Sequence, residues 1–169
     1  MNILITGGAG YIGSELVHYL IDDHDVTVVD NMMYDHTTLL RYTQHDRFNF
    51  VKGDVRDLNL LEQLVSSHDV IIPLAALVGF PLCDRDPRAA QEINQDANTW
   101  IAQNKSKDQM VIYPCTNSGY GVSVDGSVCT EESPLNPASL YGKTKVAAED
   151  AVKAVDNHVT FRLATVFGP

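Results

Sequence analysis

The chain has few of the residues that mark several large classes of protein. Among 169 residues there are three cysteines, Cys83, Cys115 and Cys129, an odd number without the Cys-x-x-Cys spacing of a zinc site or a disulfide framework. We therefore expect reduced thiols, as in the cytoplasm. No apolar run approaches the length of a membrane span, and no basic leader precedes the first strand. The sequence predicts a soluble, cytoplasmic protein with no membrane partner.

Positive charge is also scarce. Twelve lysines and arginines stand against 22 aspartates and glutamates, which gives a net charge of -10 at pH 7. Because no basic stretch interrupts this acidity, we expect no nucleic-acid partner. The six histidines show no metal-ligand spacing, so no metal site is expected. With 44% hydrophobic residues, the chain can bury the core of one domain, which we expect to cover residues 1–169.

Short apolar runs alternate with helical segments, the pattern of a parallel sheet covered by helices. Two long helices are predicted over about 87–104 and 140–155, a shorter one over 37–44, and a loop over 123–138. The predicted strands cover about 3–5, 26–29, 48–51, 70–74, 110–113 and 159–163. Right-handed crossovers then give an α/β fold, a Rossmann-type doubly wound parallel sheet with strand order 3-2-1-4-5-6 and helices on both faces. The site is expected at the carboxyl ends of the strands.

A glycine-rich turn separates the first predicted strand from a helix, which is the context that a dinucleotide-binding fingerprint requires. It reads Thr6-Gly7-Gly8-Ala9-Gly10-Tyr11-Ile12-Gly13. Gly7 would permit the tight turn, Gly10 the approach of a pyrophosphate, and Gly13 the packing of helix on strand. Free amides of the helix start, at Tyr11 and Ile12, would stabilise the phosphate charge. The sequence therefore predicts a dinucleotide site.

The second predicted strand ends at an acidic residue, Asp30, followed by Asn31. A carboxylate here can accept hydrogen bonds from both hydroxyls of the adenosine ribose and would repel a 2'-phosphate. No arginine follows that could offset the repulsion. The pattern favours NAD over NADP, although a helix-capping or surface aspartate is the simpler alternative.

Two further segments follow predicted strands. Asp54 could accept from the adenine amino group and Val55 could cover the ring. A plain turn with Asp57 as helix N-cap is also compatible with this segment. Small side chains at the end of the fourth strand suit backbone beside a cofactor, or simply close packing. They are Leu74, Ala75 and Ala76.

Tyr141 and Lys145 are four residues apart on a predicted helix, so they share one face. A phenol with a pKa near ~10 is a poor base at neutral pH, and we expect the ammonium, together with a positively charged oxidised nicotinamide, to lower it. Thr116, just past the fifth strand, would orient a substrate hydroxyl. Such a pair alone is a common accident on amphipathic helices. With the glycine turn it predicts acid–base chemistry in alcohol oxidation.

Together these residues resemble the extended short-chain dehydrogenases/reductases, in particular the NAD-dependent nucleotide-sugar epimerase/dehydratase group. The resemblance extends over the whole chain and includes Tyr120-Gly121, Phe161-Arg162-Leu163 and Asn94, the family's structural asparagine. It implies NAD-dependent oxidation at C4 of a nucleotide-diphosphate sugar, with Thr116, Tyr141 and Lys145 as catalytic residues. Asn117-Ser118 stands where the 4,6-dehydratases of the group have Asp-Glu, which disfavours dehydration.

A narrower resemblance links Tyr113-Pro114-Cys115-Thr116-Asn117 and the segment around Cys129-Thr130-Glu131 to bacterial GDP-heptose C4 dehydrogenases. Family members are about twice as long, so we expect the C-terminal substrate domain to be absent here. The two long helices are those that commonly form a homodimer in this group. Two alternatives stay open: a non-catalytic dinucleotide-binding module, and a reductase of small carbonyl compounds that uses NADPH.

Overall fold

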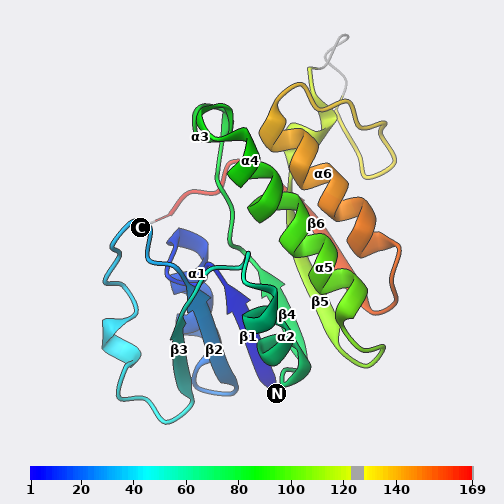
Figure 1. The fold of residues 1–169 in the computed structure, drawn as a ribbon. Coiled ribbons are helices and arrows are strands. Elements are labelled where there is room, and N and C mark those ends of the chain that lie inside the picture. The colour runs from blue at the N-terminus through cyan, green and yellow to red at the C-terminus, as the bar shows by residue number, and fades with distance from the viewer. Residues whose placement is uncertain (123–127, 169) are drawn as a thin grey trace.

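The computed structural model describes residues 1–122 and 128–168. Six parallel strands form one sheet in the order β3-β2-β1-β4-β5-β6, which confirms the predicted order (Figure 1). The strands are β1 (Asn2–Thr6), β2 (Asp25–Asp30), β3 (Phe48–Lys52), β4 (Val70–Pro73), β5 (Met110–Thr116) and β6 (His158–Leu163). The direction of strand order reverses between β1 and β4, which is where ligands bind in open α/β sheets.

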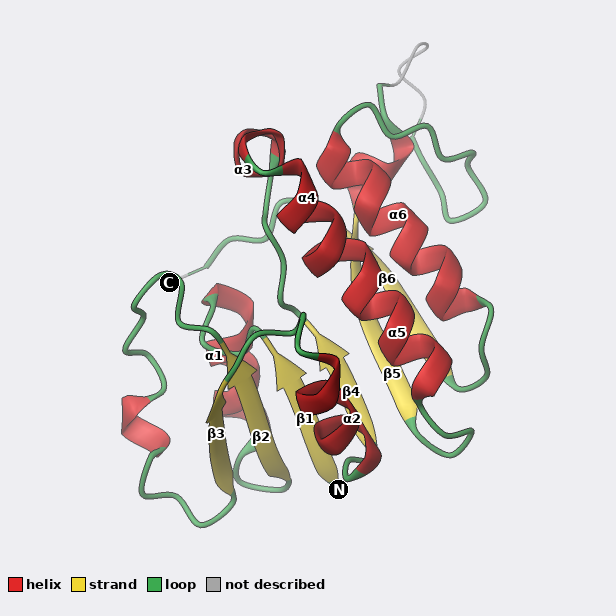
Figure 2. Ribbon diagram, in the orientation of Figure 1, coloured by secondary structure: helices red, strands yellow, loops and turns green. Residues whose placement is uncertain are grey.

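Helices cover both faces of the sheet, as predicted (Figure 2). They are α1 (Tyr11–Leu20), α2 (Leu58–Ser66), α3 (Phe80–Arg85), α4 (Pro87–Ala90), α5 (Ala97–Asn104) and α6 (Leu140–Lys153). Alternate residues of the strands pack into two hydrophobic cores, one on each face of the sheet. Leu4 and Ile71 pack with α2, α5 and α6, whereas Ile3 and Ile5 pack with Val17 of α1 on the opposite face.

Burial explains why the central strands lack polar alternation. Apart from their end residues, β1, β2 and β4 are buried on both sides, as expected for parallel strands between two helical layers. The edge strands β3 and β6 contain only half-buried and exposed positions. Val159 and Phe161 of β6 are accordingly 38% and 50% exposed.

The prediction of a helix over 37–44 is wrong. This segment contains only a short 3-10 turn, Leu40–Tyr42. The hydroxyl of Thr38 donates to the carbonyl of Ala9 at 3.3 Å, and that of Thr43 donates to Leu40 at 2.8 Å. Such local side-chain hydrogen bonds compete with regular helix, and β-branched threonine has low helix propensity.

The long helix predicted over 87–104 is helical throughout but irregular. A π-helical segment, Gln91–Asp96, joins α4 to α5. Here the Asn98 amide donates to the carbonyls of Ile93 and Asn94 at 3.2 and 2.9 Å, which inserts a side chain into the backbone ladder. Single π turns of this kind occur frequently at functional sites.

Smaller differences concern helix ends and loops. Helix α6 ends at Lys153, two residues before the predicted end. Helix α3 was not predicted, because six residues are too few to show helical periodicity. Residues 128–138 contain no helix or strand, as predicted, and the first part of that loop, 123–127, lies outside the described residues. No helix in the described part is long and apolar enough to cross a membrane.

Candidate functional site

A cavity of about 690 Å³ lies at the carboxyl ends of the central strands. It is formed by the turns that follow β1, β2, β3, β4 and β5 together with the start of α6. The structure brings every residue that the sequence singled out to this one cavity. They are Gly7, Gly10, Tyr11, Ile12, Gly13, Asp30, Asn31, Asp54, Val55, Leu74, Ala75, Ala76, Thr116, Tyr141 and Lys145.

The glycine turn depends on Gly7 for its shape and on Gly10 for its open surface. Gly7 has a φ of 70°, and a Cβ on it would lie 2.5 Å from the Ala75 nitrogen. A Cβ on Gly10 would meet only the Gly7 carbonyl oxygen, at 3.2 Å. A Cβ on Gly13 would lie 2.5 Å from the Cα of Gly8, so Gly13 packs the helix on the turn itself.

Helix α1 begins directly after this turn without a side-chain cap. Its N-cap is Gly10, which has no side chain to accept from the first amides. The helix start at Tyr11, Ile12 and Gly13 lines the cavity. Uncapped amides and the positive end of the helix dipole can therefore bind an anion there.

Asp30 ends β2 and connects two walls of the cavity. Its Oδ2 accepts from the Ala9 amide in the glycine turn at 3.1 Å, and its Oδ1 accepts from the Met32 amide at 2.8 Å. Each oxygen keeps a further lone pair for a ligand hydroxyl. Among the described residues that line the cavity, Lys145 is the one ammonium or guanidinium group, so no cation beside Asp30 would attract a 2'-phosphate.

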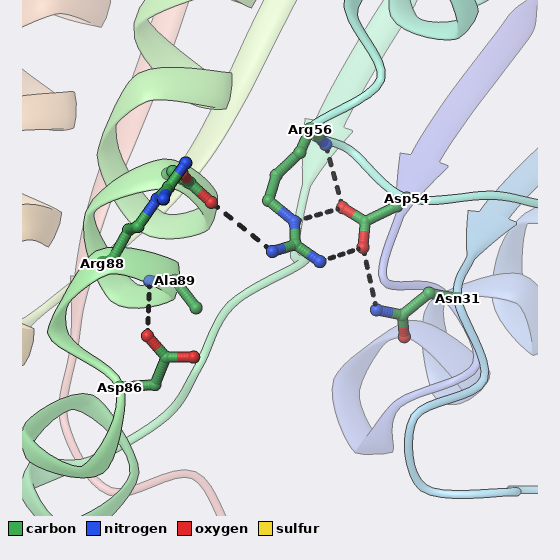
Figure 3. Close-up of polar contacts among 7 residues, drawn as sticks. Asn31, Asp54, Arg56, Asp86, Arg88 and Ala89 are labelled. Carbon is green, nitrogen blue, oxygen red and sulfur yellow. Dashed lines mark hydrogen bonds and ion pairs between the residues drawn. The ribbon is translucent and has the colours of Figure 1, made fainter.

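Asp54 lies after β3, where Arg56 holds its carboxylate (Figure 3). The Nε of Arg56 donates to Oδ1 at 2.9 Å and its Nη2 to Oδ2 at 2.7 Å, while the Asn31 amide lies 3.5 Å from Oδ2. These hydrogen bonds lower the pKa of Asp54 to about 2. Asp57 caps α2 through the Asn59 and Leu60 amides, as the simpler interpretation of this segment predicted. Arg56 was not singled out from the sequence.

The loop after β4 is fixed from both sides. The Thr6 hydroxyl accepts from the Ala75 amide at 3.3 Å. The buried Asn94 side chain accepts from the Leu77 amide at 2.8 Å and donates to the Leu77 carbonyl at 3.0 Å. Asn94 thus holds the cavity wall from the π-helical segment, which agrees with the structural role that the resemblance implies.

At the other end of the cavity Thr116 ends β5, and Tyr141 and Lys145 face it from the first turns of α6. Ser139 begins α6 by accepting from the Gly142 amide at 3.1 Å. The Thr116 hydroxyl accepts from the Ser118 amide at 3.1 Å, and both Thr116 and Tyr141 line the cavity. Lys145 is 4% exposed, and its Nζ lies 4.2 Å from the centre of the Tyr113 ring. A hydroxyl, a phenol and an ammonium therefore meet at one end of the cavity.

The electrostatics at this end differ from the prediction. Burial raises the pKa of Tyr141, and the nearby Thr116 side chain acts in the opposite direction without reversing the shift. Burial also lowers the pKa of Lys145 to about 8. The Lys145 ammonium lies over the ring of Tyr113, and the pKa of Tyr141 stays raised.

Two parts of the cavity wall were not predicted. One follows β2 and contains Met32, Met33, Tyr34 and His36, and the other covers 163–166 after β6. Met32 has a φ of 60°, a backbone conformation that its residue type does not signal. Both segments do follow the carboxyl ends of strands, which is the one sequence signal that could have found them.

A model of the family described as "NAD dependent epimerase/dehydratase family" matches residues 3–169. The low-salt glycan biosynthesis protein Agl12 of Haloferax volcanii is 34% identical over 91% of this chain and 51% of its own length. The dTDP-glucose 4,6-dehydratase of Mycobacterium tuberculosis is 30% identical over 91% of this chain and 48% of its own.

Among solved structures, the UDP-glucuronic acid 4-epimerase of Bacillus cereus, in complex with UDP-glucuronic acid and NAD, has a TM-score of 0.90 and 26% identity. The match covers 100% of this chain and 58% of that one. The chain thus spans about half the length of the relatives that it matches. It belongs to the NAD-dependent epimerase/dehydratase family.

Proposed function

We propose that the chain binds NAD in the cavity and supplies the cofactor half of an enzyme that oxidises C4 of a nucleotide-diphosphate sugar. The observation that carries this proposal is the arrangement of two chemistries in one cavity. The glycine turn and Asp30 lie at one end, and Thr116, Tyr141 and Lys145 lie at the other. NAD is the cofactor of the family, and the B. cereus relative binds it with a UDP-sugar.

The cofactor end fits NAD in three respects. The bare Gly10 surface leaves space for a pyrophosphate against the uncapped start of α1. Asp30 offers one free lone pair on each oxygen to the adenosine ribose. Asp54 and Val55 line the cavity at the turn after β3, where we expect the adenine ring.

In this proposal Tyr141 takes the proton of the C4 hydroxyl, and Thr116 hydrogen-bonds the same oxygen. Lys145 donates to the nicotinamide ribose. Bound NAD would supply the hydride acceptor, and its positive charge would favour the tyrosinate and offset the effect of burial on the Tyr141 pKa. The sugar loses one hydride and one proton and becomes a ketone.

The cavity favours redox chemistry at C4 over dehydration. The residues after Thr116 are Asn117 and Ser118, which line the cavity and carry no carboxyl group. Asp30 and Asp54 are the carboxylates among the described lining residues, and both belong to the cofactor end. An epimerase and a dehydrogenase would use the same three catalytic residues, and both outcomes fit the proposal. The resemblance to GDP-heptose C4 dehydrogenases makes GDP-sugars the first substrates to test.

The test is a single-turnover assay of NADH formation with UDP- and GDP-sugars. We expect a signal that Tyr141→Phe abolishes while NAD binding stays within a few-fold of the wild type. NAD binding without any Tyr141-dependent signal would instead support a non-catalytic dinucleotide-binding module. Tighter binding of NADPH than of NADH would favour a reductase of small carbonyl compounds.

We further propose that two copies associate through the long helices and that the protein functions in the cytoplasm. Helices α5 and α6 lie side by side (Figure 1), and the partly exposed side chains on them include Trp100, Val146 and Ala147. Ala147→Glu is expected to convert a dimer to a monomer in sedimentation. Cys83 and Cys115 are free thiols, which suits a reducing compartment.

A further inference from the structure

Arg56 connects three segments at the rim of the cavity (Figure 3). It forms two parallel hydrogen bonds with Asp54 after β3, and its Nη1 lies 3.4 Å from Oε2 of Glu92 in the π-helical segment. Through Asp54 it reaches Asn31, which follows β2. Asn31 and Asp54 line the cavity, but Arg56 does not. Arg56 therefore acts on the cavity through Asp54.

The hydrogen bonds of Asp54 leave a single weakly held acceptor position. An ionised carboxylate has about four lone-pair sites. Oδ1 accepts from both the backbone amide and the Nε of Arg56, at 3.0 and 2.9 Å. Oδ2 accepts from Nη2 of Arg56 at 2.7 Å and is only 3.5 Å from the Asn31 amide, which is the limit of a hydrogen bond. The lone pair beside Asn31 is the one that a ligand can take.

We propose that Arg56 is a positioning residue that fixes the Asp54 carboxylate so that Oδ2 presents one acceptor to the exocyclic amino group of adenine. This inference rests on the proposed binding of NAD. The two parallel hydrogen bonds from Arg56 keep Asp54 ionised and in one orientation. The site therefore selects a base with an amino group at position 6. A base with a carbonyl there, such as hypoxanthine, would place an acceptor against an acceptor.

Glu92 holds the far side of the guanidinium. Its Oε2 forms an ion pair with Arg56, and its Oε1 accepts from the Nε of Arg88 at 2.7 Å. Arg88 has 88% of its side chain exposed and makes no contact with Asp54, so it is a matched control for Arg56. The Arg56 side chain is itself 43% exposed, and exposed ion pairs contribute little to stability. The melting temperature is therefore expected to change little when either arginine is replaced.

The experiment is calorimetric titration of the intact chain with NAD and with nicotinamide hypoxanthine dinucleotide, which differs only at position 6 of the base. We expect the wild type to bind NAD about tenfold more tightly than the hypoxanthine analogue, the size of one hydrogen bond to a charged group. Arg56→Ala should bring the ratio close to unity, and Arg88→Ala should leave it unchanged. Arg56→Lys keeps the charge without the parallel hydrogen bonds, so its ratio should fall between these values.

Two results would overturn the inference and are distinguishable. If the wild type binds NAD but Arg56→Ala keeps the full ratio, Arg56 does not position Asp54. If the wild type binds neither dinucleotide, the proposed NAD site itself is wrong and the role of Arg56 fails with it. A merely structural arginine would change both affinities together and would leave the ratio unaltered.

Discussion

The ammonium of Lys145, at the reactive end of the cavity, lies 4.2 Å from the centre of the Tyr113 ring. Both side chains are buried, at 4% and 0% exposure. The ring offers a favourable cation–π contact. Burial nevertheless disfavours the charged form and lowers the pKa of Lys145 to about 8 from 10.5. A cation that the proposed chemistry requires is thus held at a cost in folding stability.

Lys145→Met is therefore expected to increase the free energy of unfolding at pH 7 by about 1–3 kcal/mol. Between pH 8 and 10.5 the unfolded chain binds more protons at this group than the folded chain, so the contribution of Lys145 to stability improves as pH rises. The gain from the substitution should be full below pH 8 and should vanish near 10.5. Urea unfolding of the wild type and of Lys145→Met across this pH range measures the gain. Cys115, Tyr113 and Tyr141 also titrate near this site, but they are present in both proteins. A gain that does not depend on pH would contradict the buried charge.

Gly7→Ala and Gly10→Ala are expected to separate folding from binding. The first puts a Cβ 2.5 Å from backbone at a φ of 70°, so it should destabilise the turn and lower the melting temperature by several degrees. In Gly10→Ala the new Cβ contacts only one carbonyl oxygen, so the melting temperature should equal that of the wild type. Calorimetry should show that Gly10→Ala nonetheless weakens NAD binding at least tenfold. Unchanged affinity in Gly10→Ala would place the pyrophosphate elsewhere.

Asp30→Asn is expected to weaken NAD binding about tenfold, because one hydrogen bond to a charged acceptor is lost at the ribose. The same change removes the charge that repels a 2'-phosphate, so the preference for NAD over NADP should shrink. Dissociation constants for both dinucleotides give this ratio. A wild type that prefers NADP, or a ratio that the substitution does not change, would count against Asp30 as the selecting residue.

Glu149→Gln is expected to cost about 3 kcal/mol of unfolding free energy, because it leaves the buried Arg162 guanidinium without a counter-charge, although the Tyr120 hydroxyl and the Glu131 carbonyl still accept from it. The Nε of Arg162 on β6 lies 3.0 Å from Oε2 of Glu149 on α6, with side chains 9% and 2% exposed. Glu92→Gln removes an exposed partner instead and should cost less than about 1 kcal/mol. Equal urea midpoints for the two variants would show that the Glu149–Arg162 pair does not hold α6 to the sheet.

The sheet and the cavity residues were predictable because both follow from local patterns. The unbroken apolar runs at Ile3 and Ile71 indicate strands buried on two faces, and right-handed crossovers then fix the strand order. The glycine turn, Asp30, Asp54 and Thr116 each follow such a strand, so the topology brings them to one edge.

What the sequence did not predict depends on contacts between distant segments. The hydrogen bonds of Arg56 with Asp54 and Glu92 join residues up to 36 positions apart. The π-helical segment forms around the Asn98 and Asn94 amides, whose hydrogen bonds no periodicity reveals. The raised pKa of Tyr141 comes from burial, which spacing along a helix does not report. The prediction of a helix over 37–44 was wrong because the tertiary hydrogen bond from Thr38 to Ala9 outweighed a weak helical pattern.

We expect this chain to form a complete NAD site. The most direct measurement is the intact mass of the protein under native conditions, before and after NAD is added. We expect a mass that exceeds a whole number of chains by one NAD per chain, with Gly10→Ala showing the mass of the protein alone under the same conditions. A wild-type mass that equals the protein alone and that added NAD does not shift would mean that the cavity holds no dinucleotide.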